Sequence, residues 1–268
     1  MKNKSPYSVI YTDDRVLVMN KASGIAIGGD RWEESAERLD RLLAAVYGPV
    51  FTVHRIDRDT SGLVVFARNR DVHRILSRAF ESRLMEKEYI AAVHGRIVWE
   101  ETVAEFPLVI DGDKRHRTIV DRYRGKPSRT LFRRLLSAGN YSLVEARPET
   151  GRTHQIRVHL AALGHPVVCD SLYGKHARSS TREGGAGHGG LERGILLSSF
   201  KKGWRGDAAQ EKPLIARLAL HAHSLAFPAA GADAAPLFPG GGLRVFTAPL
   251  PRDFHSLKNQ MEKSRGES

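Results

Sequence analysis

A cluster of ionisable side chains stands directly in front of an apolar run near residue 60. The segment His54-Arg55-Ile56-Asp57-Arg58-Asp59-Thr60-Ser61-Gly62 carries two carboxylates, two arginines and a histidine, and the apolar residues 63–67 follow it. Such a run is typical of a buried strand, and burying a charge beside it costs free energy unless the charge is paired. Two interpretations stay open: a solvated turn, or a functional loop in which Asp57 and Asp59 offer carboxylates for acid, base or nucleophilic chemistry.

A second group of polar side chains lies within residues 149–166. Thr153 is expected to be the N-cap of a short helix that Gly164 and Pro166 bring to an end. His154 and Arg157 share one face of its first turn. The aliphatic residues on another face are Ile156, Leu160 and Leu163. Spacing favours neither of two roles for Arg157: a side chain directed towards a polar cleft, or half of a structural salt bridge.

Composition narrows the class of protein. The 268 residues are 41% hydrophobic, enough for a core, and a net charge of +12 favours a polyanionic partner over a merely basic soluble protein. The single cysteine, Cys169, excludes an intrachain disulfide and a multi-cysteine metal site, and it fits a reducing cytosol. The first residues form no apolar leader and no later run has membrane-spanning length. We therefore expect a soluble, cytoplasmic protein.

Periodicity predicts alternating strands and helices in the first part of the chain. Strands are expected at 9–11 and 16–19, joined by a hairpin turn. A helix capped by Ser35 and ended by Gly48-Pro49 follows, and a second amphipathic helix starts near Asp71. The apolar stripe of the first helix comprises Ala36, Leu39, Leu42, Leu43, Val46 and Tyr47. A strand from Glu88 to Gly95 then places Tyr89 near its start.

The middle of the chain reads as successive strands, at 102–110, 117–123, 130–136 and 141–147, with no helix between them, which favours antiparallel pairing. The Gly-rich basic residues 174–213 are expected to form a mobile surface insertion, and strands resume at 218–227 and 243–247. We predict one α+β catalytic domain, residues 8–254, with a mainly antiparallel mixed sheet, flanking helices and a central cleft. A charged tail, 255–268, follows.

Several motifs carry little weight. Gly185, Gly187 and Gly190 match a dinucleotide fingerprint by letter but do not join a strand to a helix. His154 and His159 have the wrong spacing for zinc on one helical face. His221 and His223 alternate on a strand, where packed histidines are commoner than metal ligands. The sequence therefore indicates neither a metal nor a nucleotide cofactor.

Three separated stretches together resemble the RluA family of RNA pseudouridine synthases. They are residues 54–62, Glu86-Lys87-Glu88-Tyr89-Ile90-Ala91, and Gly151-Arg152-Thr153-His154-Gln155-Ile156-Arg157-Val158-His159 with its continuation through 164–166 and 170–174. Weaker similarity covers 20–24, where the family usually has proline in place of Ala22, and also 220–222 and 246–251. The order and spacing of the three main motifs make the resemblance specific, and it extends over about residues 8–254.

The resemblance implies an isomerase. Pseudouridine formation breaks the bond from ribose to the ring nitrogen, turns the uracil and rejoins it through ring carbon 5, so no cofactor is required. The family assigns the carboxylate beside the ribose to Asp57, by addition to the sugar or by a glycal route. Arg157 would pair with Asp57 and lower its pKa. Tyr89 would stack on the uracil and move the proton from carbon 5.

The implied partner is a structured RNA, ribosomal or transfer RNA, bound by a monomer. The target base must leave its stack at a cost of about a few kcal/mol, and Arg55 is the candidate for the vacated space. His54 would orient the loop, whereas Arg152 and His154 would contact phosphate or support the loop.

Two other functions remain as rivals. A base-excising hydrolase would use Asp57 and Asp59 as paired carboxylates, although carboxylates two residues apart on a turn seldom face one substrate. A non-catalytic RNA-binding protein would keep the fold and modify nothing.

Overall fold

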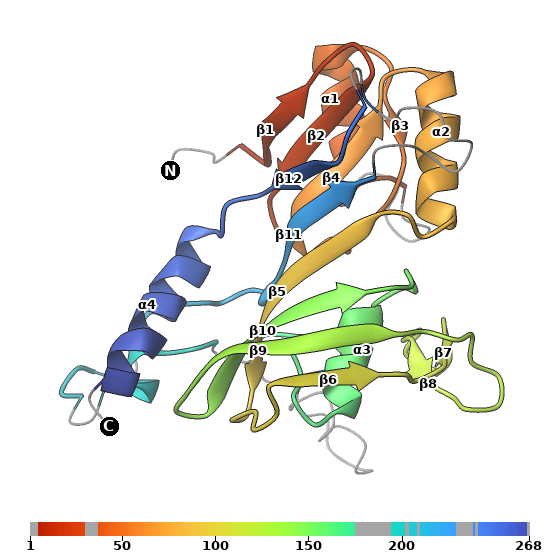
Figure 1. The fold of residues 1–268 in the computed structure, drawn as a ribbon. Helices are drawn as coiled ribbons and strands as arrows, with labels where there is room; N and C mark the ends of the chain where they lie inside the picture. Colours follow the sequence, from red (N-terminus) through yellow and green to blue (C-terminus); the bar gives the residue numbers. More distant parts are fainter. Residues whose placement is uncertain are drawn as a thin grey trace. The chain divides into compact units, whose positions relative to one another are not determined.

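The computed structural model describes residues 5–29, 37–174, 194–201, 204–207, 210–228, 238 and 241–266. The chain divides into two compact units, Met1–Tyr89 with His221–Pro249, and Ile90–Leu220 with Leu250–Ser268. Each unit combines helices with mostly antiparallel strands (Figure 1), so the predicted α+β class is confirmed. None of the described helices has the length and apolar composition that crossing a membrane requires.

The sheet of the first unit places its strands in the order β1 (Tyr7–Thr12), β2 (Val16–Lys21), β4 (Ser61–Ala67) and β11 (Leu220–Phe227). Two short strands pair at its margins, β3 (Phe51–Thr52) with β4 and β12 (Arg244–Thr247) with β11. Pairing is antiparallel except between β4 and β11, which run parallel. The predicted hairpin turn is present, and the Asp13 carboxylate accepts the Arg15 and Val16 backbone N–H groups.

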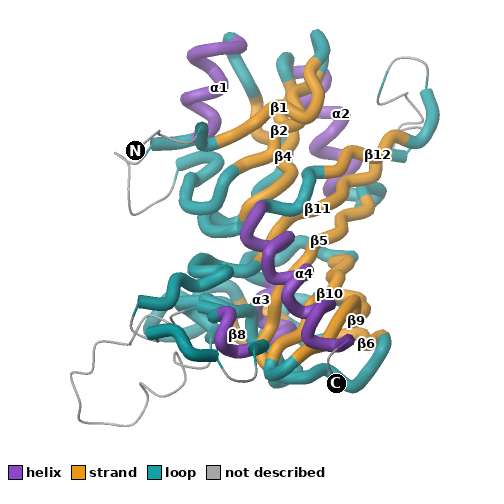
Figure 2. The backbone as a smooth tube through the Cα atoms, turned by 90° about the vertical axis from the view of Figure 1, so that its left-hand side faces the viewer, coloured by secondary structure: helices purple, strands orange, loops and turns teal. Residues whose placement is uncertain are grey.

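Helices cover both faces of this sheet, as Figure 2 shows for α1 (Leu39–Tyr47) and α2 (Arg70–Glu81). Alternate strand residues pack to opposite sides because successive side chains of a strand point to opposite faces. The side chains that pack with α2 include Val16, Val18, Leu63 and Val65, and those that pack with α1 include Leu17, Met19, Val64 and Phe66. Because both faces are covered, β4 is buried from end to end.

The two helices depart from the sequence expectation to different degrees. α2 begins after the N-cap Asn69, whose side-chain oxygen accepts the Val72 N–H. α1 begins at Leu39, after an Arg38 that makes no side-chain capping bond. The expected cap Ser35 and the first stripe residue lie outside the described residues. Val46, expected in the apolar stripe, is 65% exposed.

The second unit contains an antiparallel group of β10 (Tyr141–Pro148), β9 (Thr130–Ala138) and β6 (Glu101–Ala104). β5 (Glu86–His94) crosses the unit boundary after Tyr89. A separate small sheet pairs β7 (Leu108–Val109) with β8 (Ile119–Val120). The strands expected at 102–110 and 117–123 are therefore shorter than predicted. Pro107, which lacks an N–H, lies where the first is interrupted, and a turn at Asp121 ends the second.

Two helices complete this unit, α3 (Gln155–Ala162) and α4 (Arg252–Gly266). α4 packs against β9 and buries Phe254, Leu257 and Met261, so the segment expected as a charged tail is an amphipathic helix. Part of the expected insertion is also folded, because Ile195 is buried and bridges Ile215. The Gly-rich residues 184–190 lie outside the described residues.

Candidate active site

The loop that carries Asp57 is held by backbone hydrogen bonds. The Thr60 N–H donates to the Asp57 carbonyl at 3.1 Å and starts the turn into β4. The Gly24 N–H donates to the Arg58 carbonyl, and the Ser23 hydroxyl donates to the Asp59 carbonyl at 2.6 Å. Residues 23–24 therefore brace Arg58 and Asp59, Thr60 holds the Asp57 carbonyl, and the partly buried Asp57 side chain extends from a fixed backbone.

A buried lysine is the main support of that loop. Lys21, at the end of β2, is 0% exposed, and its Nζ donates to the carbonyls of Arg58 at 2.7 Å, Ala22 at 2.9 Å and Ile25 at 2.9 Å. A buried ammonium is costly unless hydrogen-bonded, and here three carbonyls surround it. The sequence motif at 20–24 is thereby explained as a clamp on the Asp57 loop, a role that the sequence did not reveal.

The start of β4 is fixed by β11. Gly62 has φ +116°, and a Cβ there would lie 2.2 Å from the Ala222 carbonyl oxygen, so no other residue fits this close strand approach. One residue earlier, the Ser61 hydroxyl lies 2.9 Å from Nδ1 of His221, which is fully buried. His221 and His223 each also approach the Ala248 carbonyl. These histidines therefore have structural hydrogen bonds.

Asp57 and Tyr89 meet in the first unit. Tyr89 packs against the hydrophobic cluster that contains Ile56, the residue before Asp57. The pKa of the Tyr89 phenol is raised well above its usual value, first by burial and then by the negative charge of Asp57. The phenol is therefore protonated at neutral pH, beside a carboxylate.

Arg157 belongs to the second unit and forms a buried ion pair. Its Nε and Nη2 donate to the two carboxylate oxygens of Asp170 at 2.7 and 2.8 Å, and the side chains are 4% and 0% exposed. Asp170 also accepts the backbone N–H groups of Leu172 and Tyr173. The structural salt bridge that sequence spacing left open is thus present. The pairing of Arg157 with Asp57 stays a prediction.

Tyr173 joins the ion pair to the start of α3. The Arg157 guanidinium lies over its ring, 5.2 Å from the centroid. Its hydroxyl accepts the Thr118 N–H and lies 2.9 Å from His154 Nδ1. Burial raises the pKa of Tyr173 to about 12, so the phenol keeps the proton that it can donate to His154. His154, not Thr153, is the N-cap, and its φ of +56° is a costly conformation outside glycine.

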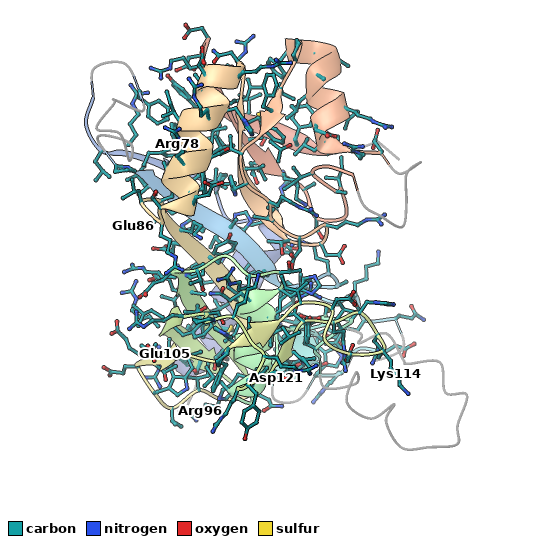
Figure 3. The ribbon with its side chains drawn as sticks, turned by 90° about the vertical axis from the view of Figure 1, so that its right-hand side faces the viewer. Arg78, Glu86, Arg96, Glu105, Lys114 and Asp121 are labelled. Carbon is teal, nitrogen blue, oxygen red and sulfur yellow. The ribbon has the colours of Figure 1, made fainter. Side chains whose placement is uncertain are left out.

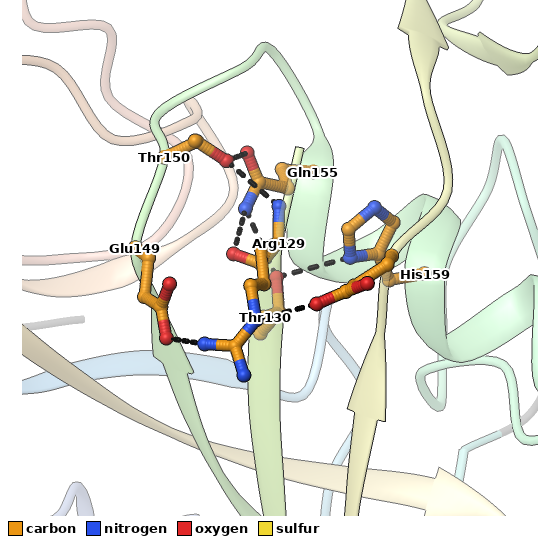
Figure 4. A network of polar contacts seen from close by, with 7 residues as sticks. Arg129, Thr130, Glu149, Thr150, Gln155 and His159 are labelled. Carbon is orange, nitrogen blue, oxygen red and sulfur yellow. Dashed lines mark hydrogen bonds and ion pairs between the residues drawn. The ribbon is translucent and has the colours of Figure 1, made fainter. Parts of the chain in front are cut away.

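The opposite side of α3 is anchored to β9 by polar contacts (Figure 4). Gln155 accepts from the Thr150 hydroxyl and donates to the Arg129 carbonyl and the Thr130 hydroxyl. One turn later, His159 Nδ1 lies 3.0 Å from the Thr130 hydroxyl. Neither Gln155 nor His159 was singled out as functional from the sequence. Their contacts fix the helix that carries Arg157.

Comparison with known proteins decides the family. The sequence profile of a family described as RNA pseudouridylate synthase matches residues 15–162. The chain belongs to this family. Pseudouridine synthases are isomerases that convert uridine in RNA to pseudouridine, which confirms the activity class expected from the three motifs.

Named relatives support the RluA branch of the family. The chain is 37% identical to "Dual-specificity RNA pseudouridine synthase RluA" of Vibrio vulnificus (strain CMCP6) over 170 residues, 62% of this chain and 68% of the relative. It is 34% identical to "Ribosomal large subunit pseudouridine synthase C" of Haemophilus ducreyi (strain 35000HP / ATCC 700724) over 262 residues, 97% of this chain and 69% of the relative. The solved structure of "Human RNA Pseudouridylate Synthase Domain Containing 4" shares the fold, with a TM-score of 0.67, 22% identity and coverage of 95% and 93% of the two chains.

The residues expected to contact RNA have different environments in this pseudouridine synthase. Arg55 is exposed, and its side chain makes no hydrogen bond or ion pair within the described part of the chain. Arg152 is partly buried, and its Nε has no hydrogen-bond partner among the described residues. His154 supports the loop through Tyr173. RNA contact by these three residues stays a prediction.

His54 has an internal role in the Asp57 loop. Its Nε2 accepts the Val65 N–H at 3.1 Å, and its ring stacks on Phe80 with centroids 4.5 Å apart. Burial, followed by the charge of Lys87, lowers the pKa of His54 to about 3. The ring is therefore neutral, and protonation of Nε2 would break the bond to β4. This environment agrees with the expected orienting role, while contact with RNA stays a prediction.

The low pKa of His54 predicts a loss of stability in acid. The imidazole has a pKa near 6.5 in the unfolded chain and about 3 in the folded chain. Between these pH values the unfolded chain binds a proton that the folded chain does not, so the free energy of unfolding decreases as the pH falls. We expect this group to lower the free energy of unfolding by up to about 3 kcal/mol between pH 7 and pH 4. Urea unfolding at several pH values measures the slope.

The matched variant is His54→Gln, because glutamine can accept the Val65 N–H and does not titrate. Its stability at pH 7 should lie near that of the wild type, with a shallower decline towards pH 4. The buried His159, whose pKa is also lowered by burial, contributes a slope with the same sign in both proteins. Equal slopes for the two proteins would rule out the role of His54.

Proposed function

We propose that Asp57 is the reacting carboxylate of this pseudouridine synthase and that Tyr89 contacts the uracil. The observation that carries the proposal is the packing of Tyr89 against the hydrophobic cluster that contains Ile56, the residue before Asp57, where burial and then the charge of Asp57 raise the pKa of the phenol. A carboxylate for the ribose and a ring for the base are the two groups that the isomerisation needs side by side. Hydrogen bonds to the backbone carbonyls of Asp57, Arg58 and Asp59 provide the fixed geometry that catalysis requires.

The electrostatic link between these side chains gives the reaction an order. Asp57 loses its negative charge either when it bonds to the sugar carbon or when it takes a proton in the glycal route. One of the two causes that raise the Tyr89 pKa then disappears. The phenol is therefore easier to deprotonate while the base is detached, when it can give its proton to ring nitrogen 1. Once carbon 5 bonds to the sugar carbon, Asp57 is a carboxylate again, and the phenolate is then the stronger base for the proton on carbon 5. Both chemical routes give the same coupling.

The third proposed catalytic residue is Arg157, as the RluA motif implies. Its bidentate bond to Asp170 fixes the plane and direction of the guanidinium, which favours a cation with a defined target over a flexible surface charge. We propose that Arg157 keeps Asp57 ionised until the substrate binds. Arg55 would occupy the space of the extruded base, and the Arg152 Nε would donate to a phosphate.

We further propose that the substrate is ribosomal or transfer RNA and that the enzyme acts as a cytoplasmic monomer. One relative is named as dual-specificity and another for the ribosomal large subunit, so both RNA classes are suitable substrates to test. The net charge of +12 supports binding to such a polyanion.

Tritium release tests the proposal and its rivals together. The purified chain is incubated with transfer RNA and, separately, with ribosomal RNA transcribed with tritium at uracil carbon 5. Isomerisation releases tritium to water and leaves the RNA intact. Abasic sites without tritium release would show a hydrolase, and binding with neither product on both RNAs would show a non-catalytic protein. Release from only one RNA assigns the substrate class.

Tyr89→Phe separates stacking from proton transfer. Phenylalanine keeps the aromatic ring against the Ile56 cluster but cannot accept or donate a proton. If the phenol moves the carbon 5 proton, tritium release should slow by about 10²-fold or more, with unchanged RNA affinity. Single-turnover release and filter binding measure the two effects. Tyr89→Leu is the comparison, since it should weaken binding as well; wild-type release by Tyr89→Phe would leave Tyr89 only a stacking role.

A further inference from the structure

A rigid turn after β8 exposes an aromatic ring. Tyr123 is 100% exposed, the highest value among the large apolar side chains of the described residues. The Asp121 carboxylate accepts the backbone N–H groups of Tyr123 and Arg124 and the Nε of Arg124, and the Gly125 N–H donates to the Asp121 carbonyl. Five hydrogen bonds, counting the one from the Asp121 N–H to Pro107, fix the backbone under the ring. The ring points to solvent from an ordered support.

The surroundings of Tyr123 are basic. Residues 111–126 contain six lysines and arginines against three aspartates. Each aspartate contacts a basic side chain of the same segment: Asp111–His116, Asp113–Arg117 and Asp121–Arg124. The exposed basic residues outside these pairs are Lys114, Arg115, Arg122 and Lys126. Figure 3 shows Lys114 and Asp121 on the loops of this region, which we name the basic lobe, residues 105–129.

We propose that Tyr123 is a stacking platform for an unpaired base of the RNA substrate, with Arg122 binding a neighbouring phosphate. The inference rests on the RNA-directed function proposed above and identifies a contact outside the three motifs. An exposed ring offers both faces to a base, and cationic neighbours attract the strand that carries it. The carboxylates of the lobe, which would repel a phosphate, are occupied in shaping the turns. Charge complementarity thus favours a nucleic acid over a neutral protein surface.

Fluorescence and salt dependence test the platform. The probe is a short single-stranded RNA carrying a fluorescent adenine analogue, whose emission is quenched by stacking, and total transfer RNA serves as the second ligand. Tyr123→Ala should weaken binding by about tenfold and abolish part of the quenching, with the salt dependence unchanged. Arg122→Gln should instead lower the slope of log affinity against log salt by about one. Tyr123→Phe should match the wild type.

Val98→Ala is the matched control, because Val98 is 83% exposed in the same unit but lies outside the basic lobe. Wild-type affinity and quenching for Tyr123→Ala would overturn the platform. The platform would also be overturned if Tyr123→Ala and the wild type sedimented differently without RNA, because the ring would then make a contact between protein molecules. Tritium release by the wild type separates the two proposals. If the wild type releases tritium and Tyr123→Ala binds RNA normally, only the platform is removed. If the wild type releases no tritium but the variants show the expected binding defects, only the isomerase chemistry is removed.

Discussion

Replacement of Asp57 by asparagine is expected to slow tritium release from uracil carbon 5 by about 10⁴-fold or more, the scale of loss when a reacting group is removed. Asparagine has nearly the same size, and the Thr60 N–H can still donate to the backbone carbonyl of residue 57. The loop should therefore keep its conformation. The amide, however, can neither add to the sugar carbon nor take a proton, so both chemical routes stop at their first step. RNA affinity and the melting temperature should stay near the wild-type values.

Asp59→Asn is the control for this experiment. Asp59 is exposed, and its anchor to Ser23 uses the backbone carbonyl, which the substitution leaves unchanged. Release by Asp59→Asn should match the wild type if one carboxylate reacts. Equal losses in the two variants would instead show that both carboxylates take part in the isomerisation. Normal release by Asp57→Asn would reject Asp57 as the reacting group.

Local patterns predicted the elements that carry these residues. The apolar run 63–67 is the buried strand β4, and the four- and three-residue spacing of Val72, Leu76 and Ala79 matches α2 and its buried face. The turn between β9 and β10 lies at Gly139-Asn140, two residue types that favour turns. Each of these signals depends on neighbours in sequence, and that is why they could be interpreted without the structure.

The supports of the site could not be predicted in the same way. Lysine is usually a surface residue, and the burial of Lys21 depends in part on the Arg58 carbonyl, which the 57–59 loop brings to it. Ser61 and His221 are 160 positions apart, so no spacing rule connects them. α4 did leave a signal, an apolar stripe at Phe254, Leu257 and Met261, but the surrounding charges obscured it. The supports of the site were therefore missed mainly because they depend on contacts between residues that are distant in sequence.

Replacement of Asp170 by alanine should strongly destabilise the second unit. The substitution leaves the Arg157 guanidinium buried without its bidentate partner, and it removes the acceptor of two backbone N–H groups. Loss of one partner of a buried ion pair costs about 3–5 kcal/mol, which urea unfolding at neutral pH can measure. Asp253→Ala is the matched control, because the bidentate pair of Arg217 with Asp253 is 24% and 26% exposed. That change should cost about 1 kcal/mol, and equal costs would refute the importance of burial.

A double substitution separates stability from catalysis at this pair. Arg157→Met with Asp170→Leu removes both charges and keeps apolar volume, and such replacements of buried ion pairs are often neutral or stabilising. The double variant should therefore regain most of the stability that Asp170→Ala loses. If Arg157 serves only the fold, tritium release should recover as well. If it holds Asp57 ionised, release should stay low in the stable double variant. Recovery of both properties would leave Asp57 and Tyr89 as the only proposed catalytic residues and make the Arg157–Asp170 pair purely structural.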